Sequence, residues 1–253
     1  EQILRDLHYT DYYITEEEKK WLEGIEYMRK FHLTDTEFEI NKALAAGKNV
    51  LAEGAQGSLL DIDHGTYPYV SSSSTTSGGV CTGLGVAPNS IGHVFGIFKA
   101  YSTRVGGGPF PVELFDETGD TIRHIGNEYG AVTGRNRRCG WLDLVALKYA
   151  IMINGVTDLV MMKGDVLDEF DTIKVCVAYT KDGETVTEMP YDTEGWQPVY
   201  EELPGWKTDL TAIRNEKDFP KAFADYIAYI EKATDTPIKI VSVGPDREAT
   251  IIR

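Results

Sequence analysis

The sequence predicts an α/β protein in which helices flank a mostly parallel central sheet with an added antiparallel hairpin. Short apolar runs alternate with helical patterns along most of the 253 residues. The dipeptide Asp182–Gly183 separates two alternating segments, which is typical of a two-residue hairpin turn. Residues 1–48 hold helical patterns alone, so we expect a helical segment there and the α/β part over residues 49–253.

The N-terminal segment is predicted to hold two helices. Over residues 15–31, apolar side chains that begin with Trp21 recur on one helix face. A second helix is expected to begin at Thr34 or Asp35, both of which are capping residues, and to end at Gly47.

The α/β part is predicted from apolar runs and turn residues taken in chain order. The expected strands cover residues 49–57, 158–165, 172–179, 184–189 and 237–246. The expected helices cover residues 90–101, 141–153 and 217–233, and the apolar sequence of 141–153 indicates burial on most sides. Three polar strand ends, in 53–57, 162–165 and 242–246, are where ligands of such sheets bind.

Residues 58–89 are rich in Gly, Ser and Thr and are predicted to form a long loop. Composition alone fits a flexible linker. The run "LLDIDHGTYPYV" within it is apolar enough to pack, and long loops inside compact proteins usually serve function. Asp61, Asp63 and His64 fit a metal site or an acid–base pair, but structural hydrogen bonding of a packed loop is the favoured interpretation.

Positive charge is concentrated in one glycine-flanked loop of a chain whose formal net charge is −15. Arg135, Arg137 and Arg138 occupy three of four consecutive positions. A guanidinium binds carboxylate or phosphate through two parallel hydrogen bonds, so the loop predicts an anionic ligand. A surface salt-bridge patch is the alternative. The net negative charge of the chain repels phosphate groups, which argues against nucleic-acid and anionic-membrane partners.

Lys163-x-Asp165 follows a predicted strand and fits a guanine-binding element. The carboxylate can accept hydrogen bonds from the N1–H and the exocyclic amine of guanine, while the lysine stem lies along the base. A helix-capping Asp165 is the alternative. Gln56 offers a donor and an acceptor to a purine edge, and no Walker A phosphate loop occurs in the sequence.

The three cysteines are widely spaced and lie in no zinc-binding pattern, which favours free thiols in a reducing compartment. No apolar run reaches the length of a membrane span. We therefore expect a cytoplasmic protein.

Long motifs of the chain resemble the adenylosuccinate synthetase family. They run in family order from Val50 to Arg253 and read "EGAQGSLLDIDHGTYPYVSSSSTT", "KAYSTRVGGGPFPVELFDETG", "GNEYGAVTGRNRRCGWLD", "KGDVLD", "YEELPGW" and "VSVGPDRE". The resemblance implies a P-loop-NTPase-like synthetase fold that is truncated here. It implies GTP-dependent ligation of IMP and L-aspartate to adenylosuccinate in AMP biosynthesis, with Mg²⁺ as cofactor, in a homodimer. The 6-oxygen of IMP is phosphorylated, and the amino group of aspartate then displaces the phosphate.

The resemblance also implies roles for individual residues. IMP would be bound by Gln56, Ser71 and Arg135. L-Aspartate would be bound by Val105, Asn127, Ala131, Val132, Thr133, Gly134, Arg135, Asn136 and Arg137. GTP would be bound by Arg137, Lys163, Gly164, Asp165, Ser242, Val243, Gly244 and Pro245.

Some family features are altered or not found in this sequence. Ser71 stands where many members have Thr, which keeps the hydroxyl, while Val132 and Asn136 replace Thr and Arg. The family's phosphate loop, its general-base and magnesium-ligating Asp, its general-acid His and an arginine lent across the dimer are expected in a segment before Glu1. We therefore expect no catalytic acid or base in this chain and no turnover by it alone. A nucleotide-binding module that performs no chemistry is the alternative function.

Overall fold

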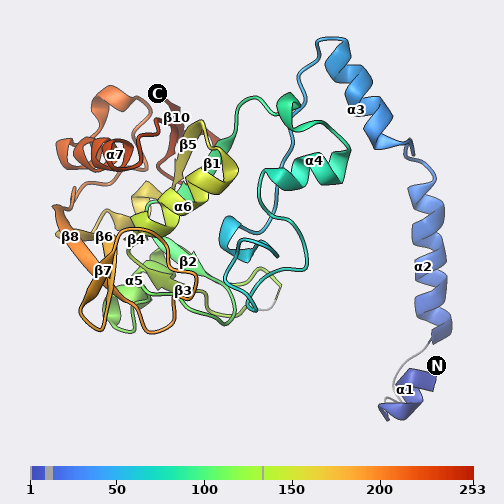
Figure 1. The fold of residues 1–253 in the computed structure, drawn as a ribbon, viewed down its shortest axis with the longest axis horizontal. Helices are drawn as coiled ribbons and strands as arrows, with labels where there is room; N and C mark the ends of the chain where they lie inside the picture. The colour runs from blue at the N-terminus through green and yellow to red at the C-terminus, as the bar shows by residue number, and fades with distance from the viewer. Residues whose placement is uncertain (1, 9–13, 133) are drawn as a thin grey trace. The chain divides into compact units, whose positions relative to one another are not determined.

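The computed structural model describes residues 2–8, 14–132 and 134–253. The chain divides into two compact units, one up to Leu51 and one from Ala52 onward (Figure 1). The division into domains after residue 48 stays a prediction. The first unit is helical and contains α1 (Gln2–Asp6), α2 (Ile14–Met28) and α3 (Thr36–Ala45).

The two helices predicted in the first unit are confirmed. Asp35 is the N-cap residue of α3, with an extended backbone and no side-chain capping bond. Gly47 has a φ of +72°, which a glycine adopts without the strain that a Cβ would impose. The apolar face of α2 is largely exposed, with Trp21 at 66%.

The central sheet of the second unit has the strand order β1-β5-β9-β10. Its strands are β1 (Phe95–Lys99), β5 (Asp158–Met162), β9 (Ile238–Ser242) and β10 (Thr250–Ile252). The pairs β1/β5 and β5/β9 are parallel, and β10 is antiparallel to β9. The predicted α/β fold with a mostly parallel central sheet is therefore confirmed.

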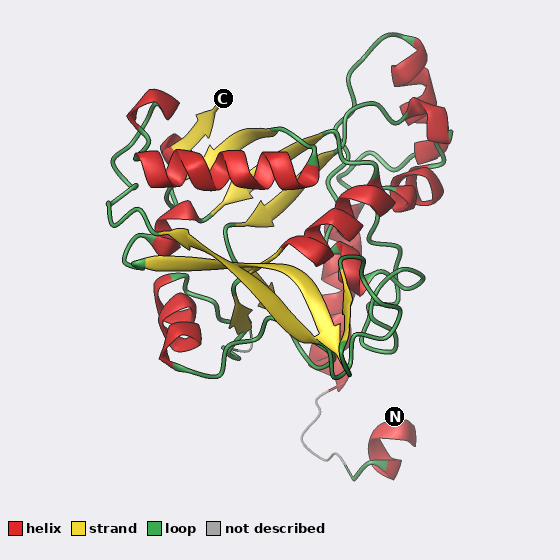
Figure 2. Cartoon of the chain, turned by 60° about the vertical axis from the view of Figure 1, so that its left-hand side comes forward, coloured by secondary structure: helices red, strands yellow, loops and turns green. Residues whose placement is uncertain are grey.

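The second sheet is built around one long strand. Its members are β4 (Leu142–Asp143), β6 (Thr172–Lys181), β7 (Glu184–Val186) and β8 (Gln197–Pro204). β6 and β8 form the long twisted antiparallel pair in the lower half of Figure 2. Asp182 and Gly183 both have positive φ and join β6 to β7, so the predicted hairpin is confirmed.

A separate two-stranded ribbon carries the arginine loop. It pairs β2 (Ser102–Arg104) with β3 (Arg138–Gly140) in antiparallel register. The remaining helices are α4 (Gly78–Leu84), α5 (Glu117–Ile125), α6 (Leu144–Asn154) and α7 (Lys221–Thr234).

The main core lies between the central sheet and the helices that cover it. Figure 2 shows α7 running beside the strands, and its Phe223, Ile227 and Ile230 are fully buried. They pack in one cluster with Leu159 and Val241 of the sheet. Burying such side chains stabilises the fold by about 1.5–3 kcal/mol each, so the sheet is a rigid base for the loops at its edge.

Four predictions about elements were wrong wholly or in part. Residues 58–89 are not one continuous loop, because they contain α4 and a 3-10 helix at Ser58–Leu60. Residues 49–57 form no strand, and Val50 and Leu51 are 43% and 87% exposed, so this apolar run neither pairs nor packs. Residues 90–101 contain β1 instead of a helix, because a short apolar run does not distinguish the two by periodicity. α6 is buried at its start, but Met152 near its end is 68% exposed.

Candidate functional site

Two polar strand ends meet at one edge of the central sheet. β5 and β9 are parallel neighbours with Met161 opposite Val241, so the residues that follow them lie side by side. Lys163–Asp165 directly follows β5. Ser242 is the last residue of β9, and Val243–Pro245 follow it. The structure thus brings together the two segments expected to bind guanine. Residues 53–57, which were also predicted to end a strand at this edge, do not do so, because no strand precedes them.

Asp165 supplies an unsatisfied acceptor at this edge. Within the described part of the chain, its Oδ1 atom is buried and has no hydrogen-bond partner. Burial raises the pKa of Asp165 above its usual value. Gly164 beside it is buried, and a Cβ there would lie 2.9 Å from the Phe223 ring, so the loop needs glycine. A buried acceptor without a partner costs about 1–3 kcal/mol, which a donor from a ligand would offset.

A second carboxylate, that of Asp168, connects the Asp165 loop to a neighbouring segment. Asp168 accepts a hydrogen bond from Trp206 Nε1 at 2.7 Å and from the Leu210 amide at 2.9 Å. Burial raises the pKa of Asp168 to about 6, although both hydrogen bonds act to lower it. Asp168 therefore fixes the turn that begins at Gly164 to the segment around residue 206.

The arginine loop is a closed hairpin that leaves Glu128 and returns at Arg137. The Arg137 amide donates to the Glu128 carbonyl at 2.9 Å, and the Gly130 amide donates to the Arg135 carbonyl at 2.8 Å. At its tip Val132 is 98% exposed. Ala131, Gly134, Arg135 and Asn136 are also exposed, as are Val105 and Asn127 outside the loop, while Thr133 lies outside the described residues.

The three arginines of this loop have different surroundings. Arg138 is held by Glu113, by the Gly108 carbonyl at 2.7 Å and by the Phe110 ring, so it serves the structure. Arg137 pairs with Glu128 at 2.9 Å, and its buried Nε has no partner among the described residues. Arg135 is exposed near the tip. The positive charges are therefore spread over separate sites, which reduces their mutual repulsion.

Glu128 is a central residue that the sequence analysis did not single out. Its side chain is fully buried, and its Oε1 accepts from Lys99 Nζ and Lys163 Nζ at 2.8 Å and from Tyr101 Oη at 2.6 Å. Burial alone would raise its pKa, but these hydrogen bonds hold the pKa at about 2. Burial also lowers the pKa of Lys99. The available signal was a lone glutamate beside an arginine-rich loop.

The long loop after residue 57 is organised around Asp61, which is 1% exposed. Its Oδ1 accepts from the amides of Asp63 and His64 at 3.0 Å, and its Oδ2 accepts from those of Thr75 and Thr76 at 2.7 and 3.2 Å. Burial opposes ionisation, but these four amides lower the pKa of Asp61. The interpretation of Asp61 as a structural residue of a packed loop is confirmed.

Of the three residues expected to bind IMP, Ser71 lies on this loop, Gln56 directly precedes it, and Arg135 lies on the arginine loop. Gln56 is exposed and has a positive φ of 63°. Ser71 is half-buried, and its amide donates to the Leu60 carbonyl at 2.8 Å. The nearby Arg104 is buried and donates to Thr66 Oγ1 at 2.9 Å and to the Gly107 carbonyl. Because Arg104 faces Arg138 across the β2/β3 pair, it links this loop to the base of the arginine loop.

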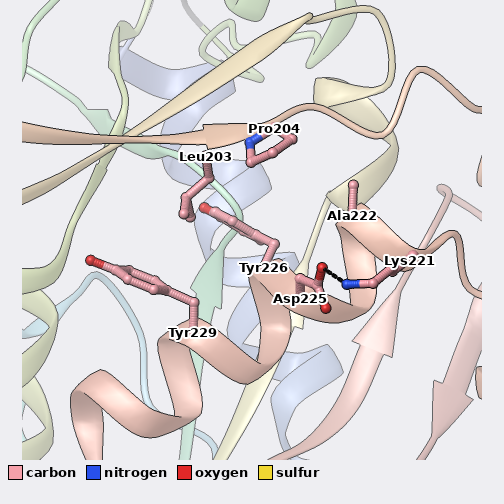
Figure 3. A pocket seen from close by; sticks show the side chains of 7 residues that line it. All are labelled: Leu203, Pro204, Lys221, Ala222, Asp225, Tyr226 and Tyr229. Carbon is pink, nitrogen blue, oxygen red and sulfur yellow. Dashed lines mark hydrogen bonds and ion pairs between the residues drawn. The ribbon is translucent and has the colours of Figure 1, made fainter.

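One surface cavity lies away from these loops, between the end of β8 and α7. It has a volume of about 530 Å³. Figure 3 shows Tyr226 and Tyr229 on the helix side and Leu203 and Pro204 on the strand side, with Lys221 paired to Asp225 at its rim. Its lining contains no residue that the sequence analysis predicted for the site.

Residues 2–8, 14–132 and 134–253 show neither a metal-binding cluster nor a membrane-spanning helix. No three His, Cys, Asp or Glu side chains gather there as a metal-binding group. Each helix in these ranges is too short or too polar to traverse a lipid bilayer.

Comparisons with known proteins agree on one family. The family model described as adenylosuccinate synthetase matches residues 1–251. Adenylosuccinate synthetases of Phocaeicola vulgatus and Bacteroides thetaiotaomicron are each 64% identical to this chain along its whole length. The chain spans 60% of the length of each of these relatives.

Two solved structures are similar to this chain in fold. The fully ligated adenylosuccinate synthetase of Plasmodium falciparum is 38% identical, with a TM-score of 0.92, over 100% of this chain and 61% of its own. The succinoaminodeoxyadenylate synthetase of cyanophage S-2L, bound to dGMP and dATP, is 19% identical with a TM-score of 0.53. It covers 85% of this chain and 49% of its own, and it shares the fold.

Proposed function

This chain belongs to the adenylosuccinate synthetase family, and we propose that it carries the guanine-, aspartate- and IMP-binding loops of such an enzyme. The reaction proposed for the whole protein is the GTP-dependent ligation of IMP and L-aspartate to adenylosuccinate in purine biosynthesis. The observation that carries this proposal is the buried Oδ1 of Asp165, which has no partner among the described residues and lies where two parallel strands end.

Guanine is proposed to bind between Asp165 and the segment Ser242–Pro245. The Asp165 carboxylate would accept hydrogen bonds from N1–H and the exocyclic amine, which adenine lacks in this arrangement. The Lys163 side chain is held by the Gly126 carbonyl and by Glu128, so its stem is fixed beside this position. Gly164 and Gly244 keep the backbone of both segments close to the packed core.

The arginine loop is proposed to bind L-aspartate and to approach the phosphates of GTP. Arg135 offers a guanidinium near an exposed, glycine-containing tip, where it can bind a carboxylate. Arg137 keeps a buried Nε donor unused among the described residues, and that donor suits a phosphate or carboxylate oxygen. Residues Val105, Asn127, Ala131, Val132, Thr133, Gly134 and Asn136 are proposed to complete the aspartate site.

IMP is proposed to bind at Gln56, Ser71 and Arg135. The amide of Gln56 can donate to and accept from a purine edge, and the hydroxyl of Ser71 can donate to the phosphate. Asp61 holds the loop that carries Ser71, so the phosphate contact depends on its four amide bonds.

Mg²⁺, a homodimer and a cytoplasmic location complete the proposal. Mg²⁺ is usually held by one or two carboxylates together with substrate phosphates and water. We assign no step to the metal, and we propose, as the resemblance implies, that its protein ligands lie outside the described residues. Among the described residues we propose substrate binding and transition-state contacts by Arg135 and Arg137, with no general acid or base.

Equilibrium dialysis tests the proposal directly. We expect this chain to bind GDP and IMP, and to bind ADP and UMP at least about tenfold more weakly, because ADP lacks the N1–H and the exocyclic amine of guanine and UMP lacks the purine ring. Equal binding of GDP and ADP would contradict the guanine assignment.

Turnover is tested separately by absorbance. A mixture of this chain with GTP, IMP, L-aspartate and Mg²⁺ is expected to form no adenylosuccinate. Formation proportional to chain concentration would place an acid and a base within these residues, and Asp63 and His64 would be substituted first.

A further inference from the structure

The Glu128 carboxylate connects two loops that the proposed function assigns to different ligands. Its Oε1 is 2.8 Å from Lys163 Nζ, on the loop proposed for guanine. Its Oε2 is 2.9 Å from Arg137, on the loop proposed for aspartate. Glu128 itself is in neither set of proposed ligands. A fully buried carboxylate therefore lies between the two loops.

The charge balance makes both contacts depend on this one group. Lys99, Lys163 and Arg137 all form their ion pairs with Glu128 in the described part of the chain. Three positive charges thus share one negative charge within hydrogen-bond distance. Moving one cation away leaves the carboxylate freer to move toward the others, and removing the carboxylate leaves the three to repel one another.

The backbone connects the same two loops. Lys163 has a left-handed φ of 62°, and its ammonium also donates to the Gly126 carbonyl at 2.7 Å. Two residues further on, the Glu128 carbonyl accepts the Arg137 amide that closes the arginine loop. A shift of Lys163 therefore displaces the segment from which the arginine loop begins.

We propose that Glu128 is a positioning residue that couples the Lys163–Asp165 loop to the arginine loop, residues 130–137. Occupation of one loop changes the order of the other, and through it the affinity for the second ligand. This coupling is reciprocal for binding free energies. Its ligand-dependent part rests on the proposed function, whereas the mechanical link between the loops does not.

Amide hydrogen exchange of the ligand-free chain, followed by NMR, tests the mechanical link. Lys163→Met removes one cation from Oε1 together with the hydrogen bond to the Gly126 carbonyl, and it substitutes no residue of the arginine loop. We expect it to speed exchange of the Gly130 and Arg137 amides roughly fivefold or more, the lower end of usual coupling. Glu128→Gln is expected to do the same, and the double variant to do no more than Glu128→Gln alone.

Two controls distinguish coupling between the loops from a general loss of stability of the fold. Lys174→Met removes the exposed pair with Glu202 and is expected to leave both amides within about twofold of wild type. Amides of the β6/β8 pair are expected to keep their protection in every variant, which a destabilised fold would not allow. If Glu128→Gln fails to fold, the comparison of arginine-loop amide exchange between Lys163→Met and Lys174→Met still tests the link between the loops. Unchanged arginine-loop exchange in Lys163→Met would overturn the proposal.

The same measurement with GDP tests the consequence for ligands. Saturating GDP is expected to slow exchange of the Gly130 and Arg137 amides in wild type and to have no such effect in Glu128→Gln. GDP that binds without slowing these amides in wild type would contradict coupling between the ligand sites. GDP that does not bind wild type would contradict the proposed function instead, and the ligand-free comparison would still decide the link.

Discussion

The Asp61 carboxylate lies 2.7 Å from the amide nitrogen of Thr75, 14 residues further along the chain. Through this contact one side chain closes the loop that carries Ser71. Three further amides point at the same carboxylate, so the loop is built around a buried negative charge. Gly65 fits inside this arrangement because a Cβ there would meet the Asp61 carbonyl at 2.5 Å.

Asp61→Ala is predicted to destabilise the chain by about 3 kcal/mol, because four amides lose their acceptor. IMP binding is predicted to be lost with the order of the loop. Asp63→Ala, at an exposed position two residues away, is the matched control and should change stability by less than about 0.5 kcal/mol. Urea unfolding of both variants measures this, and equal effects would contradict the role of Asp61.

Glu128→Gln is predicted to lower stability most at neutral pH and progressively less in acid. The pKa of Glu128 is about 2 in the folded chain against an ordinary value of 4.5. The unfolded chain therefore binds this proton first, so the ionised group stabilises the fold above pH 4.5 and loses this effect as the pH falls toward 2.

Urea unfolding of wild type and Glu128→Gln over a pH series checks this prediction. The stability difference between the two should shrink steadily below pH 4.5. Glu202→Gln, which removes an exposed carboxylate, should change stability by less than about 1 kcal/mol. A Glu128→Gln difference that stays constant into acid would mean that the carboxylate is not held ionised by its three cations.

Arg135→Leu is predicted to weaken L-aspartate binding and to spare GDP. Loss of a charge-assisted pair costs on the order of 2–5 kcal/mol. Calorimetric titration of L-aspartate in the presence of IMP measures the loss. Arg214→Leu, at an exposed position outside the site, serves as the control. An aspartate affinity equal to that of wild type would remove Arg135 from the proposed site.

Gly164→Ala is predicted to destabilise the chain by about 1–3 kcal/mol and to weaken GDP binding. Its new Cβ would lie 2.9 Å from the Phe223 ring, so the ring or the Asp165 loop must move. Gly83→Ala in α4 has open space around its Cβ and should be neutral or stabilising. Thermal unfolding and GDP titration of both variants distinguish a packed loop from a tolerant one.

Sequence patterns predicted the elements whose signals are local. The hairpin at Asp182–Gly183 depends on two turn residues, and β5 and β9 are apolar runs that end in polar residues. β1 was expected as a helix. It is a strand because it pairs with β5, about 60 residues further along the chain, and local periodicity carries no information about such distant pairing.

The candidate binding loops stand out in the sequence, whereas the contacts that support them do not. Lys163-x-Asp165 and the arginines stand out in the sequence because their chemistry is local. Glu128 does not, since its partners Lys99 and Lys163 lie 29 and 35 residues from it in the chain. Its importance arises from packing, which brings three cations to one buried carboxylate.

The most direct test of the account is guanine discrimination by Asp165→Asn. Calorimetric titration with GDP and IDP compares ligands that differ by the exocyclic amine, which the Asp165 carboxylate is proposed to bind. Wild type is predicted to prefer GDP by roughly tenfold or more, and Asp165→Asn to lose that preference. Asp225→Asn, at an exposed pair with Lys221, should keep it. An Asp165→Asn variant that still prefers GDP as wild type does would contradict the account.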